Sequence, residues 1–422
     1  MKHISGFSFF ALMVFMSSLT SAVSAQDASS SIAQPDTASI QQTVTVAQIF
    51  EQGLAAIDDG NFGNAAAAFR AILSVYPNHV PARRALVGVL IKTGNYDAAE
   101  FHLHELLKTD TGLRNQDTYL KSLDKIVRTE PLSFSGSFAI LPSTNVNNGT
   151  QNVYFNSDLG QFIIDESSRE ASGFGLNAGV GGSYRWALGG GQTLKMTASL
   201  SGVWYEIETL RHVDAAVAFS YQKETAKTHW SIGPYVRRSW YAPVYTGNNS
   251  DNIAQGISFS YTHHISPSNE ITFDTRFEEQ SHLEKTYFSG LFLSSTLKLE
   301  HSLNSKTQYT LTFGAQRYEP EAAQMAYQGL SVTAGVNTVW RNSMITGVSV
   351  GLGNRNYDAN HTSLPFPRED DYYSIGLTAQ NNKFEIFGIV PQFGCTYKRN
   401  LSNVAFYDYQ TTDCKIVLTR NF

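Results

Sequence analysis

Two histidine pairs are the first places where this chain of 422 residues could hold a metal or do acid-base chemistry. His102 and His104 are two residues apart, and a helix points side chains at that spacing in different directions, so they cannot share one ligand. His263 and His264 would lie on opposite faces of a strand. The sequence has no H-E-x-x-H, G-x-S-x-G or C-x-x-C motif and no phosphate-binding glycine loop. We therefore expect no catalytic residue, no metal site and no cofactor, with a hydrolase built from one acid and one base as the enzymatic alternative.

The two cysteines, Cys395 and Cys414, fall on the last two predicted strands and share a face with apolar neighbours. Opposed positions of a hairpin bring β-carbons to about 4.5–5.5 Å, which is near the distance that a disulfide tolerates. An oxidising compartment such as the periplasm would allow the bond. Two hypotheses follow: a bridge that fastens the last hairpin, or two buried, unpaired thiols.

The N-terminal segment and the composition place these residues in an exported protein. Residues 1–25 read as a signal peptide with an apolar stretch and small residues before a cleavage site, and residues 26–43 as a flexible linker. No later apolar run reaches the roughly 18 residues of a spanning helix, so a membrane protein would have to be a barrel. The net charge of −5 and the lack of a basic run exclude a nucleic-acid partner.

A helical repeat follows the linker. Gly60-Asn61-Phe62 recurs 34 residues later as Gly94-Asn95-Tyr96, which is the length of a tetratricopeptide repeat. We predict a tetratricopeptide-like domain over residues 44–130, capped by a further helix near 115–127. These helices either only pack together or form a groove that binds a polypeptide. The residues expected to pack the repeats are Gly60, Ala65, Phe69, Pro77, Gly94, Ala99 and Leu103.

After Pro131 the apolar residues alternate with a period of two, as in LKMTASLSGVW at 194–204. Such segments predict fourteen strands in residues 131–422, near 133–140, 172–186, 192–205, 209–222, 227–238, 252–265, 269–280, 284–299, 306–317, 325–339, 343–355, 369–379, 385–397 and 411–422. Short turns follow the even strands and longer loops follow several odd ones. That asymmetry is typical of an outer-membrane barrel, with its turns in the periplasm and its loops outside. A soluble β-sandwich is the alternative.

The final stretch, KIVLTRNF, alternates in the same way and ends on Phe422. A last strand that pairs with the first would leave no open edge. The predicted fold class is therefore α + β with two domains: N-terminal tetratricopeptide helices, then a transmembrane antiparallel β-barrel of about 14 strands.

This arrangement resembles the surface lipoprotein assembly modifier family. FSGSFAILPSTNVNNGT at 134–150 is similar to the family's first strand and asparagine-rich loop, with Asn145 and Asn147 at matching places. The stretch 397–422 resembles its closing hairpin, with Ser402 and Asn403 in the loop and Phe422 at the end. Asn145 and Asn147 could contact a client or belong to a loop that plugs the barrel, but asparagine is also a common turn former.

The resemblance implies an outer-membrane translocator that exports specific client proteins: surface lipoproteins, or secreted haem-carrier or metal-carrier proteins. Its implied partners are the client, a periplasmic chaperone, outer-membrane lipid and the barrel assembly machinery, and its N-terminal domain would lie in the periplasm. The alternative is a diffusion channel for small solutes or polysaccharide with the repeats as a scaffold. A purely structural anchor is a third hypothesis.

Overall fold

A computed structural model describes residues 45–421 except 111, 158–159, 243–249, 362–363 and 386–388. The predicted signal peptide, the linker and Phe422 lie outside the described residues, so those assignments stay predictions. None of the described helices is long and apolar enough to cross a bilayer.

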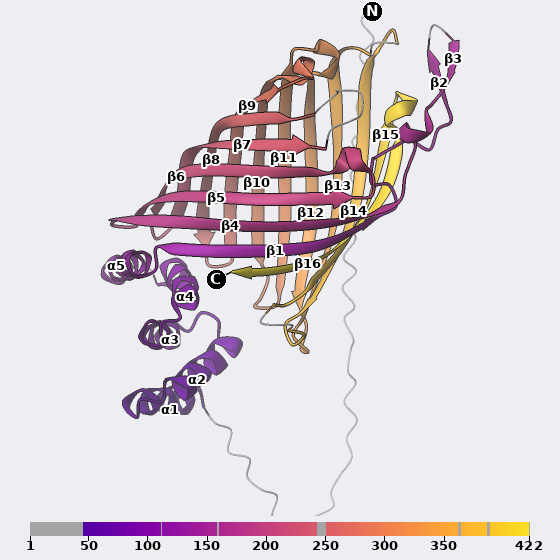
Figure 1. The fold of residues 1–422 in the computed structure, drawn as a ribbon. Coiled ribbons are helices and arrows are strands. Elements are labelled where there is room, and N and C mark those ends of the chain that lie inside the picture. The colour runs from indigo at the N-terminus through magenta and orange to yellow at the C-terminus, as the bar shows by residue number, and fades with distance from the viewer. Residues whose placement is uncertain are drawn as a thin grey trace, which may run out of the picture. The chain divides into compact units, whose positions relative to one another are not determined.

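Five α-helices come first in the described part of the chain (Figure 1). The repeated Gly-Asn-aromatic motif ends one helix and begins the next: Gly60 and Gly94 both have φ 72°, and Asn61 and Asn95 cap α2 and α4 through their side chains. Glycine reaches positive φ without strain, and asparagine satisfies a free N–H of the first helical turn. The motif therefore marks each sharp turn between paired helices. The helices are α1 Val46–Asp58, α2 Phe62–Val75, α3 Val80–Lys92, α4 Tyr96–Thr109 and α5 Leu113–Thr129.

The helical core is built from the positions that match at the repeat offset. Ala65, Phe69, Ala99 and Leu103 are all 0% exposed. A Cβ atom on Gly53 would lie 2.6 Å from the Phe69 ring, so this glycine lets α1 approach α2 closely. Helix α2 ends at Val75, two residues before Pro77.

Helix α5 extends the stack by burying Tyr119, Leu123 and Ile126. It occupies the place of the predicted helix near 115–127. The Leu120 side chain approaches Gly191 in the turn after β4, within 3.0 Å of where a Cβ atom would stand. The last helix therefore packs against both the repeats and the start of the barrel.

The rest of the described chain is a closed antiparallel barrel of fourteen strands (Figure 1). The alternating sequence pattern predicted this number, and it is confirmed. The barrel strands are β1 Leu132–Ser143, β4 Gly173–Gly189, β5 Gln192–Tyr205, β6 His212–Glu224, β7 Thr228–Tyr241, β8 Asn252–Ser266, β9 Asn269–His282, β10 Gly290–Ser302, β11 Thr307–Pro320, β12 Tyr327–Val339, β13 Met344–Asn360, β14 Pro367–Asn381, β15 Gln392–Ser402 and β16 Tyr409–Asn421.

Strand β1 pairs with the last strand, β16, and thereby closes the barrel. The pairing runs from Ser135 opposite Asn421 to Ser143 opposite Asp413. On its other edge β1 pairs with β4, from Leu132 opposite Tyr184 to Ser143 opposite Gly173. Both edges of the sheet are therefore satisfied, as a membrane barrel requires.

The outer face of the barrel is apolar and exposed, which is the reverse of a water-soluble protein. Val180, Leu330 and Leu352 are 63%, 64% and 54% exposed. Tryptophans lie on this face near both ends: Trp186 and Trp340 close to the short turns, Trp204 and Trp240 close to the longer links. This pattern matches the aromatic girdles at the two interfaces of a bilayer.

Two predicted strand starts were wrong. The region predicted as a strand from 284 instead contains a 3-10 helix at Thr286–Phe288, and β10 begins at Gly290. That link contains Thr286, Tyr287 and Phe288, residue types that are common in strands. The strand predicted from 385 begins at Gln392, after Pro391, which has no N–H to donate to a ladder. The short hairpin β2 Tyr154–Ser157 and β3 Gly160–Ile163 was not predicted.

Candidate functional site

Large aromatic and cationic side chains line the inner wall of the barrel across six consecutive strands, β11 to β16. Their inward direction follows from register, because the residues of opposite parity on the same strands, such as Leu352, Ile375 and Phe393, are exposed on the apolar outer face. All lie toward the long-loop end. We call this set the aromatic–cationic band; its members are Tyr318, Tyr327, Arg355, Tyr357, Arg368, Tyr372, Lys398 and Tyr409.

Three rings of the band form a ladder across β11, β12 and β13. The ring centroids of Tyr318 and Tyr327 are 5.8 Å apart, and those of Tyr327 and Tyr357 are 5.4 Å apart. These separations suit tilted aromatic pairs, which stabilise beyond simple burial. Directly paired residues on neighbouring strands make these contacts, since Tyr318 opposes Tyr327 and Tyr327 opposes Tyr357. The sheet register therefore sets the ladder.

The cations of the band lie over its rings. Arg355 is 5.3 Å from the centroid of Tyr327 and 6.0 Å from that of Tyr372. Lys398 is 5.3 Å from Tyr372 and 5.5 Å from Tyr409. Each cation thus bridges rings from two strands, in the geometry of cation–π attraction.

Arg368 differs from the other two cations because it is neutralised. Its Nε and Nη2 atoms donate to both carboxylate oxygens of Asp370, at 2.9 and 2.6 Å, and Asp370 is 1% exposed. The guanidinium lies 4.7 Å from the centroid of Tyr357 and 3.4 Å from that of Tyr407, which belongs to the 3-10 helix η5 Ala405–Tyr407. Arg368 therefore attaches the link between β15 and β16, which contains η5, to the lumen wall.

A second lumenal cluster, on β7 and β9, surrounds one buried carboxylate, that of Glu278. Glu278 is 1% exposed and accepts hydrogen bonds from Tyr235 and Gln280. Arg237 and Arg276 lie 4.0 and 3.5 Å from its carboxylate oxygens. Because a buried charge needs such partners, this cluster reads as part of the wall's own structure.

Space for the band is provided by Gly353 on β13. A Cβ atom at this position would lie 2.4 Å from the ring of Tyr372, which stands opposite it in the register. The glycine therefore lets the ring lie flat against the wall between Arg355 and Lys398.

Helix α4 contacts the other end of the barrel, the short-turn rim, through a row of ion pairs. Glu100, His104 and Lys108 are spaced four residues apart and share one face of the helix. The Glu100 carboxylate accepts two bonds from Arg185 of β4, at 2.7 and 3.0 Å. His104 lies 3.4 Å from Glu224 of β6, and Lys108 lies 3.4 Å from Glu270 of β9. We call these three contacts the rim row.

The rim row changes the acid-base behaviour of its helical members. Burial alone would lower the pKa of His104, but hydrogen bonds to Glu100 and Glu224 outweigh it and raise this pKa to about 9. Burial would raise the pKa of Glu100, yet His104 and Arg185 hold it below the ordinary value. Lys108 has a raised pKa because Glu105 and Glu270 overcome its desolvation. All three residues are therefore charged at neutral pH.

The structure joins the two cysteines. Cys395 opposes Cys414 on β15 and β16, their Cα atoms are 4.0 Å apart, and the sulfurs form a disulfide. The neighbouring pair on the same face is Phe393 and Ile416, which are 45% and 40% exposed on the outer wall. The disulfide therefore lies on the apolar outer surface of the barrel.

Asn145 and Asn147 bond their amides to the backbone of the loop that carries them, and Asn145 also bonds to β16. Asn145 is 1% exposed; its Nδ2 donates to the carbonyl oxygens of Gly149 and of Gln410 on β16, at 2.8 and 2.9 Å. Asn147 donates to the carbonyl of Arg169 at 2.8 Å and accepts from the N–H of Ala171. These bonds fit the turn-forming alternative, and client contact stays a prediction. Figure 1 shows the β2–β3 hairpin of the same loop beyond the barrel end rather than in the lumen.

Ser402 and Asn403 shape the closing hairpin. The Asn403 Oδ1 accepts from the N–H of Glu369 at 2.9 Å, and its Nδ2 donates to the carbonyl of Pro367 at 2.9 Å. The Ser402 hydroxyl accepts from the N–H of Val404. This loop is therefore bonded to the start of β14, next to Arg368 of the band.

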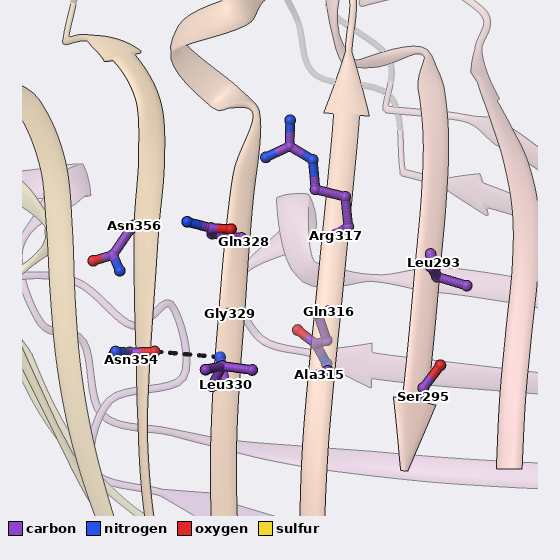
Figure 2. Close-up of a pocket in the computed structure, with 10 residues that line it drawn as sticks. All are labelled: Leu293, Ser295, Ala315, Gln316, Arg317, Gln328, Gly329, Leu330, Asn354 and Asn356. Atoms are coloured by element: carbon purple, nitrogen blue, oxygen red, sulfur yellow. Dashed lines mark hydrogen bonds between the residues drawn. The ribbon is translucent and has the colours of Figure 1, made fainter.

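The outer wall also carries a depression of 330 Å³ near the long-loop end, lined by both apolar and polar side chains (Figure 2). Arg317, Gln328 and Asn356 lie in one register row there, and Asn354 accepts from the N–H of Leu330. Arg317 forms ion pairs with Glu319 and Asp358. Leu293 and Leu330, which line the depression, are exposed on the apolar outer face, so the depression lies on the outside of the barrel and not in the lumen.

Neither the band nor the rim row was predicted from the sequence. Glu100, His104 and Lys108 gave a signal, a charged stripe at helical spacing, but their partners lie 85 to 162 residues away in the chain. The band residues occupy inward strand positions, and only the register shows which rings and cations meet. Among the described residues, no group of three or more His, Cys, Asp or Glu side chains could hold a metal ion.

The closed barrel, its apolar outer wall and the helical repeats at its short-turn rim define an outer-membrane β-barrel protein with a periplasmic repeat domain. Residues 133–422 match the family described as surface lipoprotein assembly modifier, and residues 56–121 match the tetratricopeptide repeat. The chain belongs to the surface lipoprotein assembly modifier family.

Relatives from Haemophilus influenzae carry the same name. Surface lipoprotein assembly modifier 1 is 23% identical over 377 residues, which span 86% of this chain and 75% of the relative. Surface lipoprotein assembly modifier 2 is 21% identical over 373 residues, spanning 85% and 74%. Among solved structures, CdiB from Acinetobacter baumannii aligns over 69% of this chain and 60% of its own, with 11% identity and a TM-score of 0.40.

Proposed function

We propose that this protein moves specific client proteins, in the first place surface lipoproteins, across the outer membrane to the cell surface. Membership of the surface lipoprotein assembly modifier family over residues 133–422 is the observation that carries the proposal. The name of that family describes assembly of surface lipoproteins. No enzymatic step is part of the proposal.

The route that we propose leads from the repeat domain into the lumen. The repeat helices receive the client or guard the periplasmic mouth, where the rim row attaches α4 to β4, β6 and β9. The client then passes along the inner wall, where the aromatic–cationic band lies nearer the outside. Client folding at the surface, or a periplasmic delivery chaperone, would supply the driving force, and the barrel assembly machinery would insert the barrel.

Gene deletion in the native host tests this proposal. Surface-exposed proteins are released by external protease, identified by mass spectrometry and compared with wild type. Complementation uses two chains: the full sequence and a matched chain that lacks residues 45–130.

Specific loss of one or two surface lipoproteins, restored only by the full chain, would support translocation and identify the clients. An unchanged set of surface proteins, together with altered uptake of small solutes or export of polysaccharide, would overturn it and favour a diffusion channel. If the chain that lacks residues 45–130 also restores the surface lipoproteins, the repeat domain is not needed for translocation.

A further inference from the structure

We propose that the aromatic–cationic band is a binding surface for acidic segments of the client polypeptide as they pass through the lumen. This inference rests on the proposed function and deepens it by naming the chemistry that the lumen recognises. The band spans β11 to β16, which is six of the fourteen barrel strands, so it covers a large part of the inner circumference.

Uncompensated positive charge is the first reason. Neither Arg355 nor Lys398 forms an ion pair with any described residue, since the nearby Asp370 gives both of its oxygens to Arg368. Asp413, a neighbouring lumenal carboxylate on β16, accepts instead from the hydroxyls of Ser143 and Thr411. The band therefore carries two positive charges that a carboxylate-bearing partner would complement.

Free hydrogen-bond donors are the second reason. A cation–π contact uses the face of the ring and leaves the N–H groups of the cation available. Within the described chain, the guanidinium of Arg355 donates no hydrogen bond, and Lys398 donates one, to the Tyr409 hydroxyl at 3.0 Å. The rings thus hold both cations in place while their donors stay free for carboxylate oxygens, and charge-assisted bonds of this kind are strong.

The arrangement of the wall is the third reason. Arg237 and Arg276 share the one carboxylate of Glu278, whereas Arg355 and Lys398 lie among tyrosines, whose rings can contact many kinds of side chain. A surface of rings and unpaired cations suits a moving chain, because it attracts acidic residues without requiring one sequence.

Binding of defined peptides to the purified full-length protein in detergent tests the inference. The probes are two fluorescent twelve-residue peptides of equal length, one rich in glutamate and the other with glutamine at the same positions. Fluorescence anisotropy gives each Kd at low salt. A third probe, an anionic polygalacturonate oligosaccharide, reports whether carboxylates on a sugar chain bind equally well.

The test variant is Arg355→Gln with Lys398→Gln, which removes both free charges and keeps the side chains polar. Arg355→Lys keeps the charge. The matched control is Lys195→Gln on β5, a cation near the short-turn rim without an ion pair among the described residues. Heat-modifiable mobility on gels shows that each variant forms a folded barrel.

We expect the glutamate peptide to bind wild type, Lys195→Gln and Arg355→Lys within about twofold of each other, and the double variant at least about tenfold more weakly. Equal binding of the glutamine peptide, or unchanged binding by the double variant, would overturn the inference. Preference for the oligosaccharide over the glutamate peptide would assign the band to polysaccharide instead.

Failure of the inference can be told apart from failure of the proposed function. If gene deletion removes surface lipoproteins but the double variant restores them fully and binds the peptide normally, only the band's role is wrong. If deletion leaves the surface unchanged while peptide binding still depends on Arg355 and Lys398, the band binds acidic polymers and the translocator proposal is wrong.

Discussion

Gly53 and Gly88 are both helix-interior glycines, yet their surroundings predict opposite effects of an added methyl group. At Gly53 a Cβ atom would lie 2.6 Å from the ring of Phe69, which is 0% exposed and cannot move aside, whereas nothing lies within 4 Å of a Cβ at Gly88. We expect Gly53→Ala to destabilise the helical domain by about 1–2 kcal/mol through overpacking. Gly88→Ala should stabilise it by up to about 1 kcal/mol, because alanine favours the helix.

Thermal unfolding of the full chain, followed by ellipticity at 222 nm, checks both glycine substitutions. The lower transition belongs to the helices if the barrel melts later, as a fourteen-strand barrel should. An unchanged midpoint for Gly53→Ala would contradict the close packing of α1 against α2, and a lower midpoint for Gly88→Ala would contradict the open space at this position of α3.

His104 makes the docking of α4 on the barrel rim depend on pH. Its pKa is about 9 in the docked helix, above the ordinary value of 6.5, so the protonated ring stabilises docking. That contribution is complete below about pH 6.5 and is lost as the pH rises through about 9. Glu100 and Glu224 face the ring, and Arg185 and His229 share those carboxylates.

We expect the helical domain to move away from the rim between pH 7 and pH 10. Spin labels at Ser74 and Ser199 would show a growing population of longer distances by pulsed electron resonance. His104→Gln should weaken docking at pH 6 and remove most of this pH dependence. A distance distribution in wild type that does not change with pH would be the contrary result.

Helix α4 docks the helical domain on the barrel rim. Exchanging the charges of Glu100 and Arg185 tests this contact. Glu100→Arg places two cations together at Arg185, whose side chain is 18% exposed, and should weaken docking by about 1.5–3 kcal/mol. Adding Arg185→Glu should restore most of it. The same spin-label distances provide the measurement.

The exposed pair Asp117 and Lys121 on α5 supplies a control for this exchange. Their side chains are 63% and 73% exposed, and such surface pairs contribute little. Asp117→Lys should therefore leave docking unchanged. Failure of the double exchange to restore docking would indicate that the Glu100 contact is not what attaches the helix.

The elements were more predictable than the contacts between them. Alternation identified fourteen strands because one face of each meets lipid, and the 34-residue offset identified the repeats because Gly60 and Gly94 perform the same turn. The rim row escaped prediction because Arg185, Glu224 and Glu270 reach α4 only after the barrel closes. The band was not predicted because the alternation shows only which side chains point inward. The register between strands decides that Tyr327 lies opposite Tyr357.

For the whole molecule, the disulfide predicts a measurable contribution to barrel stability. Cys395 and Cys414 are 19 residues apart, and closing a loop of that length constrains the unfolded chain by about 3 kcal/mol. Cys395→Ser with Cys414→Ser should lower the temperature at which the barrel loses its folded mobility on gels. Wild type that is reduced while unfolded and then refolded should behave like the variant. Identical unfolding temperatures would show that the strand ladder alone sets barrel stability.

The position of this disulfide also indicates when, relative to membrane insertion, it forms. Both sulfurs lie on the apolar outer wall beside Phe393 and Ile416, where a bilayer excludes water-soluble oxidants and thiolates. Oxidation must therefore precede insertion, while β15 and β16 are still in the aqueous periplasm. Strand β16 pairs with β1 only when the barrel closes. The hairpin of β15 and β16, with its disulfide, therefore forms before barrel closure separates the lumen from the lipid-facing wall.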